Sequence, residues 1–225
     1  MDSKEKAKIL IIGKGGKKEG MGHLVRIATL VDTLSERYDV TVLSMHDRFG
    51  EFFFKQKTIS SHTYTDNRGL YRFLDKNGPY SAILIDVYRI SIGVLDKISL
   101  YCDWIVNFDD MKRRVCHPIN GVYICPQEPF NSKVDTAPNG NPAVVSGTDY
   151  FPLRPVFREY RKEKKFSEEI RDVGIILGGV PEPSYTLELT AQLDRFLPPA
   201  VRLHVLMGYE PGQIDGPGFS GRVHF

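Results

Sequence analysis

Short apolar runs rich in β-branched residues alternate along this chain with stretches in which apolar residues recur every three or four positions. Lys8–Gly13 reads KILIIG, which is typical of a strand buried on both faces. Gly22–Tyr38 carries its Leu, Ile, Ala and Val residues on one side of a helix, and Asp39–Met45 is a second strand. This β-loop-α-β order predicts an α/β fold in which helices cover both faces of a parallel sheet.

The alternation continues to the middle of the chain and restarts near its end. Further strands are predicted at Ala82–Val87, Trp104–Asp109, Val173–Leu177 and Val201–Met207, with helices at Ser91–Cys102 and Tyr185–Leu197. Between the two blocks lie a proline-rich stretch, 126–155, and a mixed-charge segment. We therefore expect a Rossmann-like N-terminal domain over 1–155, a linker over 156–171 and a second, nucleotide-binding unit over 172–225.

The second unit is short for a domain of this class. It has roughly fifty residues, whereas a complete doubly wound domain usually needs about 100–150. We expect it to be an incomplete Rossmann-like domain whose sheet edge and apolar face are covered by a partner chain or by an oligomer contact.

Composition excludes several classes of protein. The chain of 225 residues is 41% hydrophobic and 26% charged, which is ordinary for a globular protein and excludes a disordered one. Its net charge of +2 gives no field for binding nucleic acid or an anionic membrane, and no apolar run reaches the ~18 residues of a membrane span. Three cysteines without a C-x-x-C pair favour a reducing compartment, so we expect a cytoplasmic protein.

The segment between the first strand and the first helix, Gly13–His23, is rich in glycine and lysine. In an open parallel sheet this is the edge where ligands bind, and a helix start attracts anions such as a diphosphate. Lys14 would add positive charge there. The segment matches neither the Walker nor the dinucleotide-binding pattern. The alternative interpretation is a solvated turn without a ligand.

Ionisable residues gather at the same predicted edge. His23 lies in the first helical turn, where the helix dipole favours a neutral imidazole that can accept a proton. Asp86 and Asp109 each end a predicted strand, and such a carboxylate can orient His23, bind a sugar hydroxyl or cap the following helix. The spacing of Cys116-His117 and Cys125 does not suit zinc, so we expect no metal and no cofactor.

Five short motifs resemble a known family. Gly20-Met-Gly22-His23-Leu-Val-Arg26 is similar to the G-x-G-H-x-x-R signature of nucleotide-sugar hydrolases of the pseudaminic acid pathway, which are grouped with spore-coat polysaccharide biosynthesis proteins. The other matches are Ile83–Tyr88, which resembles a strand ending in Asp-x-Tyr, Phe108-Asp109-Asp110, Gly147–Phe157 and Leu177-Gly178-Gly179. Their order along the chain follows that of the family.

The resemblance implies a two-domain glycosyltransferase-B fold and a hydrolase that releases UDP from UDP-2,4-diacetamido-2,4,6-trideoxy-β-L-altropyranose. It implies that His23 activates water for attack on the anomeric carbon, with Asp86 and Tyr88 as further catalytic residues. The implied substrate-binding residues are Gly20, Gly22, Arg26, Asp109, Asp110, Arg154, Gly178 and Gly179; Lys14 is a further candidate from the charge of the glycine-rich segment alone. The alternative interpretation of Gly178-Gly179 is a plain turn.

Two other functions fit the same residues. A glycosyltransferase of this fold would use an acceptor hydroxyl in place of water. A truncated module would bind a nucleotide sugar without turning it over. UDP release in the absence of any acceptor would separate the hydrolase from both.

Overall fold

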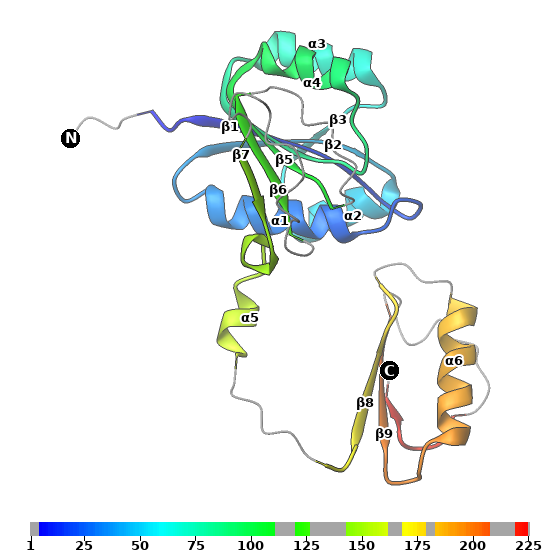
Figure 1. Ribbon diagram of the computed structural model, residues 1–225. Helices are drawn as coiled ribbons and strands as arrows, with labels where there is room; N and C mark the ends of the chain where they lie inside the picture. Colours follow the sequence, from blue (N-terminus) through cyan, green and yellow to red (C-terminus); the bar gives the residue numbers. More distant parts are fainter. Residues whose placement is uncertain are drawn as a thin grey trace. The chain divides into compact units, whose positions relative to one another are not determined.

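A seven-stranded sheet, in which every pairing is parallel, forms the centre of the first part of the chain (Figure 1). The computed structural model describes residues 5–110, 120–126, 143–161, 168–178, 183–207 and 219–224. The chain divides into two compact units, Met1–Glu159 and Tyr160–Phe225.

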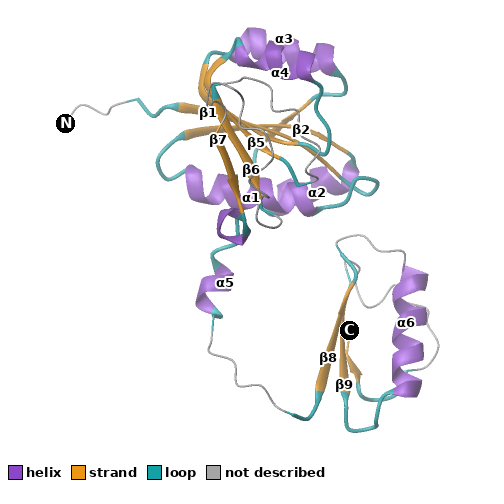
Figure 2. Cartoon of the chain, in the orientation of Figure 1, coloured by secondary structure: helices purple, strands orange, loops and turns teal. Residues whose placement is uncertain are grey.

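The elements of the first unit follow the predicted alternation (Figure 2). They are β1 (Lys8–Gly15), α1 (Gly22–Leu34), β2 (Asp39–His46), α2 (Arg48–Gln56), β3 (Ser61–Thr63), α3 (Asn67–Asn77), β4 (Tyr80–Asp86), α4 (Ile92–Ser99), β5 (Cys102–Phe108), β6 (Gly121–Cys125), β7 (Ala143–Ser146), the 3₁₀ turn η1 (Thr148–Tyr150) and α5 (Val156–Glu159).

The strand order is β3-β2-β1-β4-β5-β6-β7. The chain builds outward from β1 in one direction through β2 and β3, and then returns to β4 and builds in the other direction. The switch between the two directions lies between β1 and β4, which pair directly, with Gly13 beside Asp86. In open α/β sheets, ligands bind at the carboxyl ends of the strands at this switch point.

Two layers of helices bury the two faces of this sheet (Figure 1). On one face, α1 and α2 contribute Leu24, Ile27 and Phe54 to a cluster with the strand residues Ile9, Ile11, Val42 and Leu84. On the other, α3 and α4 contribute Leu70, Leu74, Val94, Leu95 and Ile98 to a cluster with Leu10, Ile12, Leu43, Ile83, Ile85, Ile105 and Tyr123. Alternate residues of β1 therefore serve opposite layers, which explains the continuous apolar run in the sequence.

The second unit contains β8 (Asp172–Ile176), α6 (Pro183–Phe196), β9 (Arg202–Leu206) and β10 (Val223–His224). The three strands form a parallel sheet in the order β10-β9-β8. Ile175, Leu203 and Val205 are buried, whereas Ile176 and Leu206 are more than half exposed. Asp194 of α6 accepts hydrogen bonds from Ser220 and Arg222, which connects the helix to the segment that leads into β10.

The predicted parallel α/β architecture is confirmed. The differences lie at element boundaries and in elements that the sequence analysis did not predict. Helix α1 ends at Leu34 rather than Tyr38, and the carbonyl of Leu34 accepts hydrogen bonds from the backbone N–H groups of both Arg37 and Tyr38 in the turn that leads to β2. The sequence interpretation contained neither α2 nor α3. Both begin after an aspartate whose carboxylate accepts hydrogen bonds from backbone N–H groups of the first turn, Asp47 and Asp66 respectively.

Candidate active site

Close packing of α1 against β1 brings the start of the helix to the switch point. A Cβ atom at Gly13 would lie 2.0 Å from Cδ1 of Ile27, and one at Gly15 would lie 2.5 Å from Cγ of Leu24. Because only glycine leaves this room, these two glycines serve helix–strand packing. His23 and Arg26, which directly precede Leu24 and Ile27 on α1, lie beside the end of β4.

The glycine-rich loop that follows β1 is held by its own hydrogen bonds. Gly16 and Gly20 exchange two backbone hydrogen bonds of 3.1 and 2.8 Å, and both have the positive φ that favours glycine. The carboxylate of Asp47 accepts a hydrogen bond of 2.8 Å from the backbone N–H of Lys17. The N–H groups of Gly16, Lys17 and Gly20 are therefore engaged by the protein in this structure.

Lys14 is also engaged within the loop. Its ammonium group lies 2.8 Å from the carboxylate of Glu19, and that hydrogen bond lowers the pKa of Glu19 against the opposing effect of burial. Both side chains remain about one-third exposed. Gly20 and Gly22 have open space where a Cβ atom would stand, and among the described residues no side chain caps the first turn of α1.

His23 and Asp86 form a hydrogen-bonded pair at the carboxyl end of β4. The Nδ1 atom of His23 lies 2.6 Å from Oδ1 of Asp86, whose side chain is fully buried. Burial raises the pKa of Asp86, but hydrogen bonds from Arg26 and His23 outweigh it and hold the pKa below its ordinary value. Because an ionised carboxylate only accepts hydrogen bonds, Nδ1 of His23 carries the proton, which leaves Nε2 as the basic nitrogen.

Arg26, one turn further along α1, joins this pair to Asp110. Its Nε and Nη2 atoms donate to the two oxygens of Asp86 at 2.7 and 2.5 Å, and its Nη1 and Nη2 atoms donate to those of Asp110 at 2.8 and 2.6 Å. The guanidinium also lies over the ring of Phe108, 4.8 Å from its centroid. Burial lowers the pKa of Arg26, but the two carboxylates outweigh it and raise that pKa, so Arg26 carries its charge at any ordinary pH.

One nitrogen of His23 and one oxygen each of Asp86 and Asp110 lie within 4.8 Å of one another, a spacing that a divalent cation could bridge. Arg26 forms ion pairs with both carboxylates, so a cation would have to displace the guanidinium or face its charge. The donor set therefore suits an ion-paired acid–base site better than a metal centre. The zinc interpretation of Cys116 and His117 falls outside the described residues.

Three other residues that the sequence singled out in the first unit are Tyr88, Asp109 and Arg154. Tyr88 is 48% exposed, two residues beyond Asp86. Asp109 directly precedes Asp110, and its backbone N–H bonds to the carbonyl of Ile124. Arg154 is exposed and its guanidinium lies 5.1 Å from the ring centroid of Phe157.

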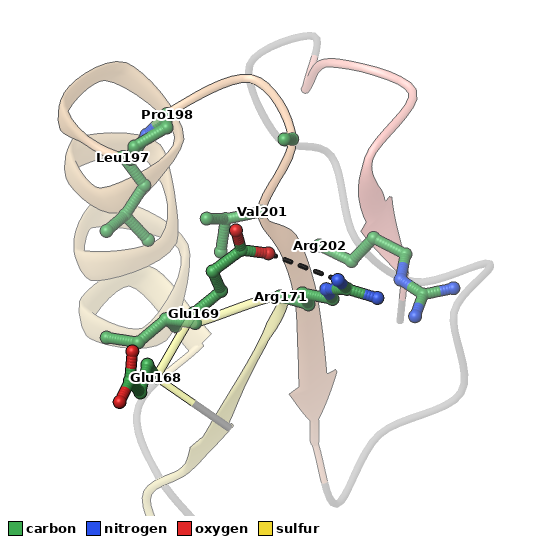
Figure 3. A pocket seen from close by; sticks show the side chains of 9 residues that line it. Glu168, Glu169, Arg171, Leu197, Pro198, Val201 and Arg202 are labelled. Carbon is green, nitrogen blue, oxygen red and sulfur yellow. Dashed lines mark hydrogen bonds and ion pairs between the residues drawn. The ribbon is translucent and has the colours of Figure 1, made fainter.

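Gly178 belongs to the second unit, where it follows β8 with a φ of +97° and open space where a Cβ atom would stand. Gly179 falls outside the described residues. A hollow of about 770 Å³ in this unit lies at the other end of the strands, before β8 and β9 (Figure 3). Glu169 and Arg171 pair beside it. It lies at the amino ends of the strands, away from the edge where such sheets bind ligands.

Asp47 is the residue of this region that sequence reasoning missed. One oxygen of its carboxylate accepts from the backbone N–H groups of Phe49 and Gly50 at the start of α2, and the other accepts from Lys17. The pKa of Asp47 is raised by burial but lowered more by these N–H groups, and is below its ordinary value. An Asp directly before a new helical segment is the signal that would have identified it.

Comparisons with known proteins agree with this architecture. No protein-family model matches the chain. The chain is a distant homologue of the spore coat polysaccharide biosynthesis protein SpsG of Bacillus subtilis, with 25% identity over 193 residues, or 82% of this chain and 54% of the relative. It thus spans about half the length of that curated relative.

A solved structure shows the same fold. MurG of Acinetobacter baumannii matches 96% of this chain and 66% of its own with a TM-score of 0.51 and 12% identity. That likeness confirms the predicted glycosyltransferase-B-like fold and, at this identity, nothing beyond the fold. Among the described residues, no helix has the length and apolar character needed to cross a bilayer.

Proposed function

We propose that the chain hydrolyses a nucleotide-activated sugar and releases UDP, with His23 as the general base. The observation that carries the proposal is the pairing of His23 Nδ1 with the buried carboxylate of Asp86, 2.6 Å apart, at the switch point of the sheet. Asp86 orients the ring and stabilises the imidazolium that forms, while Nε2 accepts the proton. The side chain of His23 is 14% exposed, so the ring is held by the protein yet in contact with solvent.

The proposed step breaks an O–H bond of water and the bond between the sugar and UDP, and it forms a C–O bond to the sugar and an N–H bond on His23. The oxygen of a water molecule attacks the anomeric carbon of the sugar while its proton passes to Nε2 of His23. The bond between that carbon and the β-phosphate oxygen breaks, and its electron pair leaves with UDP. His23 returns the proton to solvent, so the enzyme is unchanged and the products are UDP and the free sugar.

The described relative supports a sugar substrate. SpsG is named for spore coat polysaccharide biosynthesis, so we propose that this chain also acts on an activated sugar in the synthesis of a surface polysaccharide. From the motif resemblance to nucleotide-sugar hydrolases of the pseudaminic acid pathway, we propose that the sugar of the substrate is a deoxy-diacetamido sugar and that Tyr88 lies beside it. Gly178 in the second unit would face the nucleotide.

The first test is UDP release from a panel of UDP-sugars by the purified chain, followed by the same assay with His23→Ala. We expect release to fall by about 10²–10⁴-fold in the variant, because that is what a positioned general base contributes. UDP affinity should stay within about tenfold, since the base acts on the barrier and not on nucleotide binding.

Two outcomes would replace the hydrolase. UDP release that requires an added acceptor would identify a glycosyltransferase, in which His23 deprotonates the acceptor hydroxyl instead of water. UDP binding without release from any sugar, with or without acceptors, would identify a non-catalytic binding module. An equal loss of binding and release in His23→Ala would show that the imidazole has a structural role.

A further inference from the structure

The guanidinium of Arg26 is occupied by protein groups rather than open to a ligand. The described residues engage four of its five N–H bonds, two with Asp86 and two with Asp110, and Arg26 is 6% exposed. An arginine that binds a phosphate presents its fork of N–H groups to the ligand. In this chain those N–H groups donate to two carboxylates, so Arg26 is poorly placed to bind the substrate.

We infer that Arg26 and Asp110 are positioning residues that act on His23: together they set the charge around its imidazole, and with it the pH range in which His23 accepts a proton. This inference rests on the proposed role of His23 as the base. It differs from the expectation that Arg26 and Asp110 contact the substrate.

The charged groups that surround His23 come from three elements. Asp86 at the end of β4 pairs with Nδ1, and Nη2 of Arg26, on α1 itself, lies 3.3 Å from the same nitrogen. Asp110, directly after β5, offers a carboxylate oxygen within 4.8 Å of a ring nitrogen. In the adjacent glycine-rich loop, the charge of Lys14 is balanced by Glu19.

These charges nearly cancel, and the protonation state of the imidazole sets the net charge of the cluster. Two carboxylates and one guanidinium leave a single net negative charge, which an imidazolium at His23 neutralises. Proton transfer to His23 therefore brings the cluster to neutrality as water is deprotonated. Without Asp110 the resting cluster would be neutral and would resist the proton. Without Arg26 two carboxylates would face the ring and would favour its protonated form.

Two substitutions should therefore move the titration of His23 in opposite directions. In Arg26→Gln the midpoint of the His23 ring-proton titration, followed by NMR, should move to higher pH by about one unit or more, since a charge within about 4–6 Å has been removed. In Asp110→Asn it should move to lower pH. His23→Gln identifies the His23 signal among the six histidines of the chain. The acid limb of the pH profile of kcat/KM should move with the midpoint in each variant.

Matched controls lie on the same helix and just beyond it. Asp32 on α1 and Arg37 after it are exposed, so Asp32→Asn and Arg37→Gln change the net charge of the chain without touching the cluster. Both should leave the midpoint of the His23 titration within about 0.2 unit, because solvent and salt screen exposed charges that lie outside the cluster. Arg26→Lys keeps the charge, so its midpoint should lie close to that of the unchanged chain. If Arg26→Gln does not fold, Arg26→Lys and the downward shift in Asp110→Asn carry the test.

The opposite shifts are the decisive result. If Arg26→Gln and Asp110→Asn move the midpoint in the same direction, or no further than the controls, the two residues have only a structural role and the inference is overturned. A change in KM without any change in the titration would instead indicate that Arg26 contacts the substrate. The titration needs no turnover, so failure of the hydrolase assay in the unchanged chain would remove the proposed function while leaving the charge measurement intact.

Discussion

Replacement of Asp86 by Asn is the most informative single change to the stability of the first unit. The substitution keeps the shape of the side chain but removes its negative charge from a site with no solvent exposure. Arg26 and His23 would each lose a charged acceptor, at 2.7 and 2.6 Å respectively. The amide can offer one oxygen as an acceptor, and its NH₂ group would face N–H donors, so at least one buried donor stays unsatisfied.

The expected cost follows from the remaining partners. Removal of one member of a buried charge pair costs about 3–5 kcal/mol. Arg26 keeps Asp110, which still neutralises it, so we expect the lower end of that range, about 3 kcal/mol. With a urea slope of about 2 kcal/mol per M, the midpoint of unfolding should fall by about 1.5 M.

The assay is urea unfolding at pH 7 followed by the fluorescence of Trp104, the single tryptophan of the chain, which lies on β5 of the first unit. Asp32→Asn, which removes an exposed carboxylate from α1, is the matched control and should stay within about 0.5 kcal/mol of the unchanged chain. A cost below 1 kcal/mol for Asp86→Asn would refute the reasoning, because it would mean that Asp86 carries no charge in the folded state.

The pH dependence of Asp86 gives the same prediction a second readout. Its pKa in the folded state is held below the unfolded value of about 3.9, so its contribution to stability is complete above that pH and is lost as the pH falls through the folded pKa. The unchanged chain should therefore lose more stability between pH 5 and acid than Asp86→Asn does. Parallel acid curves for the two proteins would contradict this.

Further predictions concern the packing of α1, the loop and the second unit. Gly13→Ala should cost about 1–3 kcal/mol, since its Cβ would lie 2.0 Å from Ile27, whereas Gly22→Ala, with open space around it, should cost less than 0.5 kcal/mol in the same urea assay. Asp47→Ala should destabilise the first unit by about 1 kcal/mol through the lost cap of α2, with faster amide exchange at Lys17 as the local readout by NMR. Asp194 has a folded pKa of about 2, lowered first by Ser220 and then by Arg222, so its contribution to stability is lost as the pH falls below the ordinary value of 3.8. The protection factors of amides in the second unit, which allow for the intrinsic pH dependence of exchange, should therefore fall between pH 4 and about 2, and less so in Asp194→Asn.

The position of His23 is the part of the candidate site that the sequence predicts best. A buried strand, a glycine-rich segment and an amphipathic helix are neighbours along the chain, and this local order places the helix start at the carboxyl edge of the sheet. The same reasoning places Asp86 at that edge. The fold class follows from the same alternation, because it needs only the period of the apolar residues and not their partners.

The convergence of Arg26 on Asp86 and Asp110 could not be predicted in that way. It depends on β1, β4 and β5 being neighbours in the sheet, and it joins Arg26 to residues sixty and eighty-four positions further along the chain. The roles of the glycines were also hidden. Gly13 and Gly15 serve close packing against α1, and a sequence does not distinguish that use of glycine from an approach to a ligand.

Hydrolysis in ¹⁸O-labelled water tests the role of His23 as the base most directly. The purified chain is incubated with the UDP-sugar that it cleaves, and the masses of both products are measured. Our account predicts the label at the anomeric oxygen of the free sugar, unlabelled UDP, and labelling of the sugar that is about 10²–10⁴-fold slower with His23→Gln. Label in the phosphate of UDP, or undiminished labelling of the sugar by His23→Gln, would contradict it.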